Sequence, residues 1–281
     1  MIDKETLNAI CDSLDKYPPQ LTDGNYIGDE GLIYCGKCHT PKQCRLELFG
    51  EMKTRTCLCK CETEERDRLE AERKQRELDS KIKRLKMNGF PESKMREWTF
   101  EADDGKNEKL ITAAKNFVKN FDEFRRSGKG LILYGGVGTG KTFAAACIAN
   151  ALMDKGIPVL MTNFARIANT IQGMYEGKQE YYDNLNRYPL LILDDLAAER
   201  KTEFMQEIVF NVIDNRCRAG LPLIITSNLT GAELKNPADM TNKRIYSRVL
   251  EICHPLEVEG TDRRRESLKN DFERTKNLLG I

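Results

Sequence analysis

The chain has 281 residues, a formal net charge of +1, and 32% charged residues. This nearly neutral balance excludes a protein that coats nucleic acid through a global basic excess, so any contact with nucleic acid must be local. The length allows one core of roughly 150 to 200 residues with a smaller module beside it.

The first segment, "MIDKETLNAICDSLDKYPP", is too acidic and too poor in apolar residues for a signal peptide. No run along the chain approaches the roughly 18 apolar residues that a membrane span needs. We therefore expect a cytoplasmic protein with no membrane contact.

The next segment is rich in cysteine. In a reducing compartment such a cluster indicates a metal site rather than disulfides. Cys35-x-x-Cys38 has the spacing of a metal knuckle. The stretch "CLCKC" (57–61) supplies three further thiols, enough to complete a tetrahedral zinc site. The stretch "CGKCHTPKQC" is too polar for cysteines that only fill a hydrophobic core. The spacing leaves the remaining ligands open, the candidates being Cys44, Cys57, Cys59, Cys61 and His39. We expect no role for the scattered Cys11, Cys147, Cys217 and Cys253.

A charge-dense stretch, "ETEERDRLEAERKQRELDSKIKRLKM", starts at residue 62. Its strong helix formers predict a helix, but its apolar residues are too sparse for a sustained coiled-coil heptad. We expect a solvated helical linker. Composition thus divides the chain into a cysteine-rich module (residues 1–61), this linker (62–94) and a core (95–281).

Short apolar runs alternate with longer helical patterns from Leu131 onward. The runs are "LILY", "PVLMTN", "LLILDD" and "LPLIITSN", separated by segments such as "EFMQEIVFNVIDNRCRAG". Strands joined by helical crossovers predict an α/β fold, with a parallel sheet flanked by helices on both faces. Ligands bind at the carboxyl ends of the strands in such folds, so we expect the chemistry there.

A glycine-rich loop follows the first run. The stretch "GGVGTGKT" fits G-x-x-x-x-G-K-[ST] between an expected strand and an expected helix, as a phosphate-binding loop requires. Glycines let backbone N–H groups approach phosphate oxygens closely, and the helix adds its positive N-terminal end. Lys141 is expected to reach the β- and γ-phosphates, and Thr142 to ligate magnesium. The residues expected to bind ATP and magnesium here are Gly135, Gly136, Val137, Gly138, Thr139, Gly140, Lys141 and Thr142.

Polar residues end two later runs. Asp194 and Asp195 end "LLILDD", where Asp194 is expected to hold hydrated magnesium and Asp195 to orient or deprotonate the attacking water. Asn228 ends "PLIITSN" and can hydrogen-bond that water or the γ-phosphate without adding negative charge. Two acids could instead cap the next helix, and Asn at a strand end is an ordinary turn residue. Their pairing with the upstream loop favours a catalytic site.

Together these motifs resemble AAA+ ATPases, and more narrowly the bacterial and phage helicase loaders of the DnaC and DnaI type, with the related IstB transposition helpers. The resemblance spans about residues 95–265 and rests on "MREWTF", "GLILYGGVGTGKT", "LLILDDLAAE", "LIITSN" and "RIYSRVLEIC". It implies that "MREWTF" belongs to the entry of the nucleotide site, that the glycine-rich loop is Walker A, that the aspartates are Walker B and that Asn228 is sensor I. Ala197 departs from the pattern, because these proteins commonly have glycine there. The residues after Cys253 are too few for the full helical lid of many AAA+ proteins.

The resemblance also implies roles for arginines. In "KRIYSRVLEI", Arg244 and Arg248 would share one helix face, and one of them would be an arginine finger that reaches a neighbouring subunit's γ-phosphate. Arg248 is the first choice and Arg244 the alternate. The run Arg263, Arg264 and Arg265 would act as a sensor II or contact a partner, a solvated basic turn being the alternative.

A contact with single-stranded DNA is implied for the segment between the two Walker motifs. "TNFARIANTIQGMYEGKQEYYDNLNRY" resembles the family's extra initiator-type helix. Phe164, Arg166 and Lys178 would combine attraction to the DNA backbone with base stacking. Three tyrosines are either further contacts or packing residues: Tyr175, Tyr181 and Tyr182.

The resemblance finally implies the ligands of a structural zinc and a function. The family's cysteine-rich module ends in C-x-C before a charged helix, which selects Cys35, Cys38, Cys59 and Cys61. In DnaI-type loaders this module docks the replicative helicase. The implied function is an ATPase that delivers a hexameric replicative DNA helicase onto single-stranded DNA in replication initiation, with homo-oligomers forming on helicase or DNA. The alternative is an IstB-like ATPase helper of a DNA transposase.

Overall fold

The chain forms two units in the computed structural model, divided between Leu78 and Asp79. The structure describes residues 21, 24–48, 50–197, 202–237, 239–263, 272 and 274–281. Among these residues, none of the helices combines the length and the apolar character that crossing a membrane requires.

The first unit contains two small antiparallel sheets. Strand β1 (Tyr26–Ile27) pairs with β2 (Ile33–Tyr34), and β3 (Gln43–Leu48) pairs with β4 (Glu51–Thr56). Among the described residues of this unit, the buried apolar side chains are those of Leu32, Cys35 and Cys59. Because so small a core stabilises a fold poorly, a further source of stability is needed here.

Helix α2 (Lys60–Gly89) follows β4 and runs through the boundary between the units. Most of its side chains are exposed, and ion pairs join residues three or four apart in its first half. The four of these pairs with the shortest separations are Arg68–Glu65, Arg73–Glu77, Lys74–Glu70 and Arg76–Glu72. This is the solvated helix that the composition predicts.

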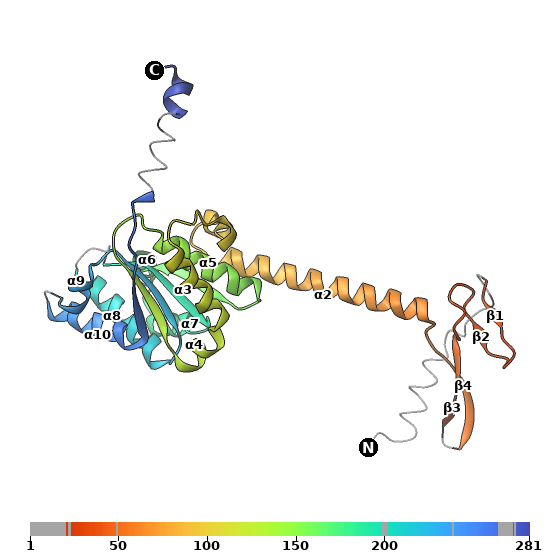
Figure 1. Cartoon of the computed structure of the whole chain (residues 1–281). Coiled ribbons are helices and arrows are strands. Elements are labelled where there is room, and N and C mark those ends of the chain that lie inside the picture. Colours follow the sequence, from red (N-terminus) through yellow and green to blue (C-terminus); the bar gives the residue numbers. More distant parts are fainter. Residues whose placement is uncertain are drawn as a thin grey trace. The chain divides into compact units, whose positions relative to one another are not determined.

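The second unit is built on a five-stranded parallel sheet (Figure 1). Its strands are β5 (Gly130–Tyr134), β6 (Val159–Asn163), β7 (Leu190–Leu196), β8 (Leu223–Ser227) and β9 (Cys253–Glu257), in the order β6-β7-β8-β5-β9. Strand β8 lies between β5 and β7, so the three segments that follow these strands leave the sheet side by side at one edge.

Helices cover both faces of this sheet, because successive strand residues point to opposite sides. Leu131 and Leu133 pack into one apolar cluster and Ile132 into the other. The first cluster includes residues of η1 (Ser93–Glu97), α3 (Glu108–Lys119), α4 (Phe121–Ser127) and α5 (Lys141–Asp154). The second includes residues of α6 (Phe164–Gln172), α7 (Lys178–Leu185), α8 (Glu203–Arg218), α9 (Gly231–Lys235) and α10 (Met240–Ile252). The predicted α/β fold is confirmed.

Candidate functional site

The glycine-rich loop joins β5 to α5 in a conformation that glycine alone adopts easily. Gly135, Gly138 and Gly140 have φ angles of +129°, +76° and +97°. A Cβ on Gly135 would lie 2.6 Å from the carbonyl oxygen of Val258, and one on Gly138 would collide with Asp262. These positions of the loop therefore carry no side chains, and its backbone is accessible to a ligand. The loop ends at the N-terminus of α5, where backbone N–H groups can bind an anion.

The lysine and threonine that open α5 lie inside this loop and beside β7. Lys141 Nζ donates to the carbonyl oxygens of Gly135 (3.0 Å) and Gly136 (2.5 Å), and the residue is only 5% exposed. The Thr142 hydroxyl donates to Asp194 Oδ1 at 2.9 Å. The fold thus places the first Walker B aspartate against the Walker A threonine, although 52 residues separate them.

A cavity of about 330 Å³ opens over the loop. Asp195 and Asn228 both line it with the loop itself, so the structure brings together the residues that the sequence assigned to hydrolysis. Asp195 has a φ of +59°, a left-handed conformation that costs a non-glycine residue energy and that clusters at functional sites. Ala197 also has a positive φ, of +70°, a conformation that glycine adopts more easily than alanine.

Arg263 also lines this cavity. Its backbone N–H donates to Gly138 O at 3.1 Å, and its guanidinium lies 2.9 Å from the Asp104 carboxylate. The sequence left this arginine open between a sensor II, a partner contact and a basic turn. Arg264 and Arg265 lie outside the described residues.

The segment around "MREWTF", which the family resemblance places at the entry of the nucleotide site, forms another wall of the cavity. Trp98, Ala102 and Asp104 line the cavity. The buried Asn150 side chain of α5 donates to the carbonyl oxygens of Met95 and Trp98, at 2.8 Å each. A lone polar residue inside the apolar helix "FAAACIANAL" was the available signal, because buried amides require partners.

The two arginines of α10 lie away from this cavity. Arg248 donates to Glu251 Oε2 (2.8 Å) and its Nε lies 3.3 Å from Asp214 Oδ1 in an ion pair, and the Arg244 guanidinium lies 6.0 Å from the centre of the Phe210 ring. Neither lines the nucleotide cavity. Both side chains instead lie against residues of α8, Asp214 and Phe210.

Four cysteine thiols converge in the first unit. The sulfur atoms of Cys35, Cys38, Cys59 and Cys61 all lie within 4.8 Å of one another. Cys35 and Cys61 are 3.6 Å apart, and Cys59 and Cys61 are 3.2 Å apart. The Thr40 hydroxyl, 3.1 Å from Cys38 Sγ, is the main cause that lowers the pKa of this thiol to about 5, whereas burial raises the pKa of Cys59. Four thiols at such separations fit a tetrahedral zinc site.

The other candidate ligands lie elsewhere. Cys57 Sγ lies 3.5 Å from the carbonyl oxygen of Pro41, and Cys44 sits on β3 opposite Arg55 of β4. His39 Nδ1 lies 3.3 Å from the Tyr26 hydroxyl. The structure therefore brings together the four cysteines that the resemblance selected and leaves these three residues outside the group.

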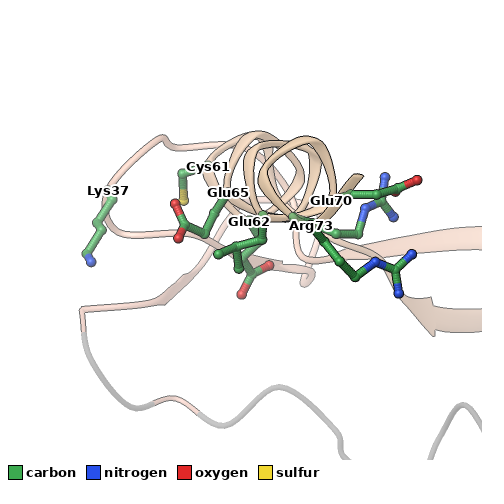
Figure 2. A pocket seen from close by; sticks show the side chains of 8 residues that line it. Lys37, Cys61, Glu62, Glu65, Glu70 and Arg73 are labelled. Carbon is green, nitrogen blue, oxygen red and sulfur yellow. The ribbon is translucent and has the colours of Figure 1, made fainter. Parts of the chain in front are cut away.

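A hollow beside Cys61, at the start of α2, is lined by side chains of both charges (Figure 2). Its acids are Glu62, Glu65 and Glu70, and its bases are Lys37, Arg66 and Arg73. Because the charges balance, this hollow does not favour a phosphate backbone, and a DNA contact is better sought in the second unit.

The segment expected to bind DNA forms α6, α7 and their connection. Its structure contradicts the predicted contact of Phe164 with DNA. Phe164 is 1% exposed in the core, so its ring cannot stack on a base and the predicted contact is wrong. Arg166 and Lys178 are exposed. Tyr182 is buried and Tyr181 packs beside it, whereas Tyr175, between two glycines in the connection, is fully exposed at 102%.

The sheet, the glycine loop and the paired aspartates define a P-loop nucleotide-binding protein. The chain belongs to the IstB-like ATP binding protein family, whose model matches residues 63–270. It is similar to the replicative helicase loader DnaI of Bacillus subtilis (strain 168), at 32% identity over 163 residues that cover 53% of this chain and 51% of that protein. It is also similar to the replicative helicase loader DnaC of Escherichia coli (strain K12), at 24% identity over 143 residues (50% and 56%).

A solved structure has the same core. The crystal structure of DnaI matches with a TM-score of 0.52 and 26% identity, covering 64% of this chain and 99% of that one. The AAA+ type of fold and the resemblance to this family are thus confirmed. The chain spans about half the length of the curated relatives it matches.

Proposed function

We propose that this protein is an ATP-dependent helicase loader, which delivers a hexameric replicative DNA helicase onto single-stranded DNA at the start of replication. The observation that carries the proposal is the 32% identity to the helicase loader DnaI. The cluster of four thiols in the first unit agrees with it, because it fits the zinc-bearing, helicase-docking module that the resemblance implies for residues 1–61. The protein would meet its helicase and DNA in the cytoplasm.

The proposed reaction is ATP hydrolysis. Lys141 binds the β- and γ-phosphates, exchanging its carbonyl partners for phosphate oxygens. Thr142 and Asp194 would hold a magnesium ion, which neutralises phosphate charge when bound. Asp195 orients or deprotonates the attacking water, and Asn228 hydrogen-bonds that water or the γ-phosphate. All the oxygen donors needed lie at one edge of the sheet, so this set fits the hard cation.

Arg263 would add a positive charge from the same chain. Its guanidinium reaches the cavity and is held by Asp104, at 2.9 Å. The arginine would bind phosphate oxygens through its planar donor fork, while Asp104 keeps it aimed. Of the three arginines in this run, it is the one whose described position supports the proposed sensor II role.

Removal of a zinc ligand gives the first expected result. Cys59→Ser should lower the zinc content from about one ion per chain to near zero, because three thiolates hold the ion weakly and the small core of the first unit cannot replace it. Metal analysis of the purified protein measures this. Cys57→Ser is the matched control and should keep the zinc, and the opposite pattern would move the ligand to Cys57.

Single-stranded DNA binding is assigned to the connection between α6 and α7. Tyr175→Ala should weaken binding roughly 5- to 150-fold, because stacking one base on an aromatic ring contributes about 1–3 kcal/mol. Tyr175→Phe keeps the ring and should bind nearly as the natural protein does. Fluorescence anisotropy with a labelled oligonucleotide measures both. Equal affinity of the alanine variant and the natural protein would remove Tyr175 from the DNA site.

Reconstitution with purified partners tests the function itself. The helicase of the same host should unwind a primed DNA circle coated with single-strand-binding protein only when this chain and ATP are both present. The alternative, an IstB-like helper of a transposase, is favoured by the family description and by 27% identity over 139 residues to a putative ATP-binding protein in an insertion sequence of Mycobacterium tuberculosis. Stimulation of a transposase of the host, without any effect on the helicase, would replace the proposed function by this alternative.

A further inference from the structure

The carboxyl end of β7 departs from regular pairing where the two Walker B aspartates lie. Leu193 pairs with Ile225 of β8, and the next registered pair is Leu196 with Ser227. Two residues of β7, Asp194 and Asp195, therefore face one residue of β8, Thr226. This is a β-bulge, which leaves a backbone group without its regular ladder partner and redirects side chains.

The Thr226 side chain occupies this irregularity. It is fully buried, at 0% exposure. Its hydroxyl oxygen accepts a hydrogen bond from the Asp195 backbone N–H at 2.9 Å and donates its proton to Asp194 Oδ1 at 2.6 Å. One hydroxyl thus fixes the backbone of the second aspartate and the carboxylate of the first.

The geometry points to Thr226 as a positioning residue for the nucleotide site, and we propose that it aligns both Walker B aspartates. Asp194 Oδ1 accepts from Thr226 of β8 and from Thr142 of α5, so its direction is set by a strand and a helix at once. Asp195 is held at a φ of +59°, and its N–H bond to Thr226 stabilises this unfavourable backbone conformation. Without the hydroxyl, both carboxylates would lose their alignment: that of Asp194, which would ligate magnesium, and that of Asp195, which lines the cavity.

The neighbouring serine has a different task, which separates Thr226 from general support of the sheet. Ser227 is also buried, but its hydroxyl donates to the Leu196 carbonyl oxygen at 2.7 Å and accepts from the Leu229 N–H at 3.2 Å. It holds the backbone beyond the bulge and touches neither aspartate side chain. Among the described interactions of these two hydroxyls, the direct bond to a Walker B carboxylate belongs to Thr226.

The inference rests on the proposed ATPase, and magnesium dependence is its most direct readout. Thr226→Val keeps the shape of the side chain and removes the hydroxyl. It should bind a fluorescent ATP analogue in EDTA within about twofold of the natural protein. The magnesium concentration that gives half of the full analogue affinity should rise about 10-fold or more, as when a group that orients a metal ligand is lost. Turnover at saturating magnesium should fall by a similar factor.

Two variants make the test specific. Thr226→Ser keeps the hydroxyl and should restore the magnesium response to within about threefold. Thr162→Val, the same substitution on β6 of the same sheet, should leave that response unchanged. If Thr226→Val is too unstable to purify, Thr226→Cys takes its place, because its thiol is a weak donor and should give an intermediate shift.

The outcomes separate the inference from the function on which it rests. A natural protein that binds the analogue with magnesium but never hydrolyses ATP would refute the ATPase, while the magnesium titration would still test Thr226. A valine variant that melts at a lower temperature but keeps the natural magnesium response and turnover would show that Thr226 only supports the sheet. That result would overturn the inference.

Discussion

Lys141→Ala should weaken ATP binding by roughly a hundredfold or more, because the variant lacks the cation that faces the phosphates. Lys141 is 5% exposed and its ammonium group is held by Gly135 O and Gly136 O, so it is already inside the loop before a phosphate arrives. No other lysine lines this cavity among the described residues, so a substitute charge of the same reach is missing there. Titration with a fluorescent ATP analogue measures the loss.

Two further variants define what the lysine does. Lys129→Ala removes a lysine whose ammonium group donates to Glu251 O, outside the cavity, and it should bind ATP normally. Asp195→Asn should keep ATP binding and lose hydrolysis, because holding phosphates and activating water are separate tasks. Normal turnover in Asp195→Asn would take that residue out of the mechanism, and tight binding by Lys141→Ala would refute the assigned phosphate site.

The nucleotide motifs could be predicted from the sequence because their signals are local. The glycine spacing around Gly135 and Gly140 needs only the loop and its two flanking elements, and the run before Asp194 marks a buried strand by itself. Their meeting follows from one rule, that ligands collect at the carboxyl ends of parallel strands. The 2.9 Å bond between Thr142 and Asp194 realises that expectation.

Other parts of the site depend on registers that no local pattern reveals. The bulge opposite Thr226 arises from how β7 and β8 pair, and the approach of Arg263 to Asp104 joins segments far apart in the chain. The identity of the zinc ligands also depends on the fold. The spacing of the cysteines left Cys57 as a candidate ligand, and only the folded hairpin places its thiol beside Pro41 and outside the cluster of four.

The error at Phe164 had a signal in the sequence. Phe164, Ile167, Ala168 and Ile171 repeat at the i, i+3, i+4, i+7 spacing of a helix face turned toward a core, and all four are buried. The aromatic ring was assigned to DNA because basic residues stood nearby. The apolar period was the stronger physical constraint, since burying a Phe side chain contributes about 1.5–3 kcal/mol.

The surroundings of Arg248 allow it to act on a neighbouring subunit. Its bond to Glu251 is an exposed ion pair, which contributes at most about 1 kcal/mol and is readily exchanged. Its second partner, Asp214, is nearly buried but is also held by Arg218 at 2.8 Å, so that carboxylate keeps a partner when Arg248 leaves. Because Arg248 does not line its own nucleotide cavity, a catalytic role requires contact between subunits.

Arg248→Ala should therefore bind ATP normally and hydrolyse it roughly a thousandfold more slowly, measured with helicase and DNA present so that subunits meet. Arg218→Ala is the matched control, since it removes the other arginine on Asp214 and should leave turnover unchanged.

Mixing two inactive variants provides the decisive measurement. When Arg248→Ala and Lys141→Ala proteins are mixed in equal amounts, roughly one interface in four joins the intact nucleotide site of an Arg248→Ala subunit to the intact Arg248 of a Lys141→Ala subunit. Hydrolysis should return in the mixture, although each variant alone is inactive. If Arg244→Ala shows this rescue while Arg248→Ala hydrolyses normally, the finger lies one helical turn earlier, on the residue now stacked against Phe210. If neither substitution slows turnover, hydrolysis uses no arginine of α10, and the charge that stabilises the transition state must come from the chain's own site, where Arg263 lies.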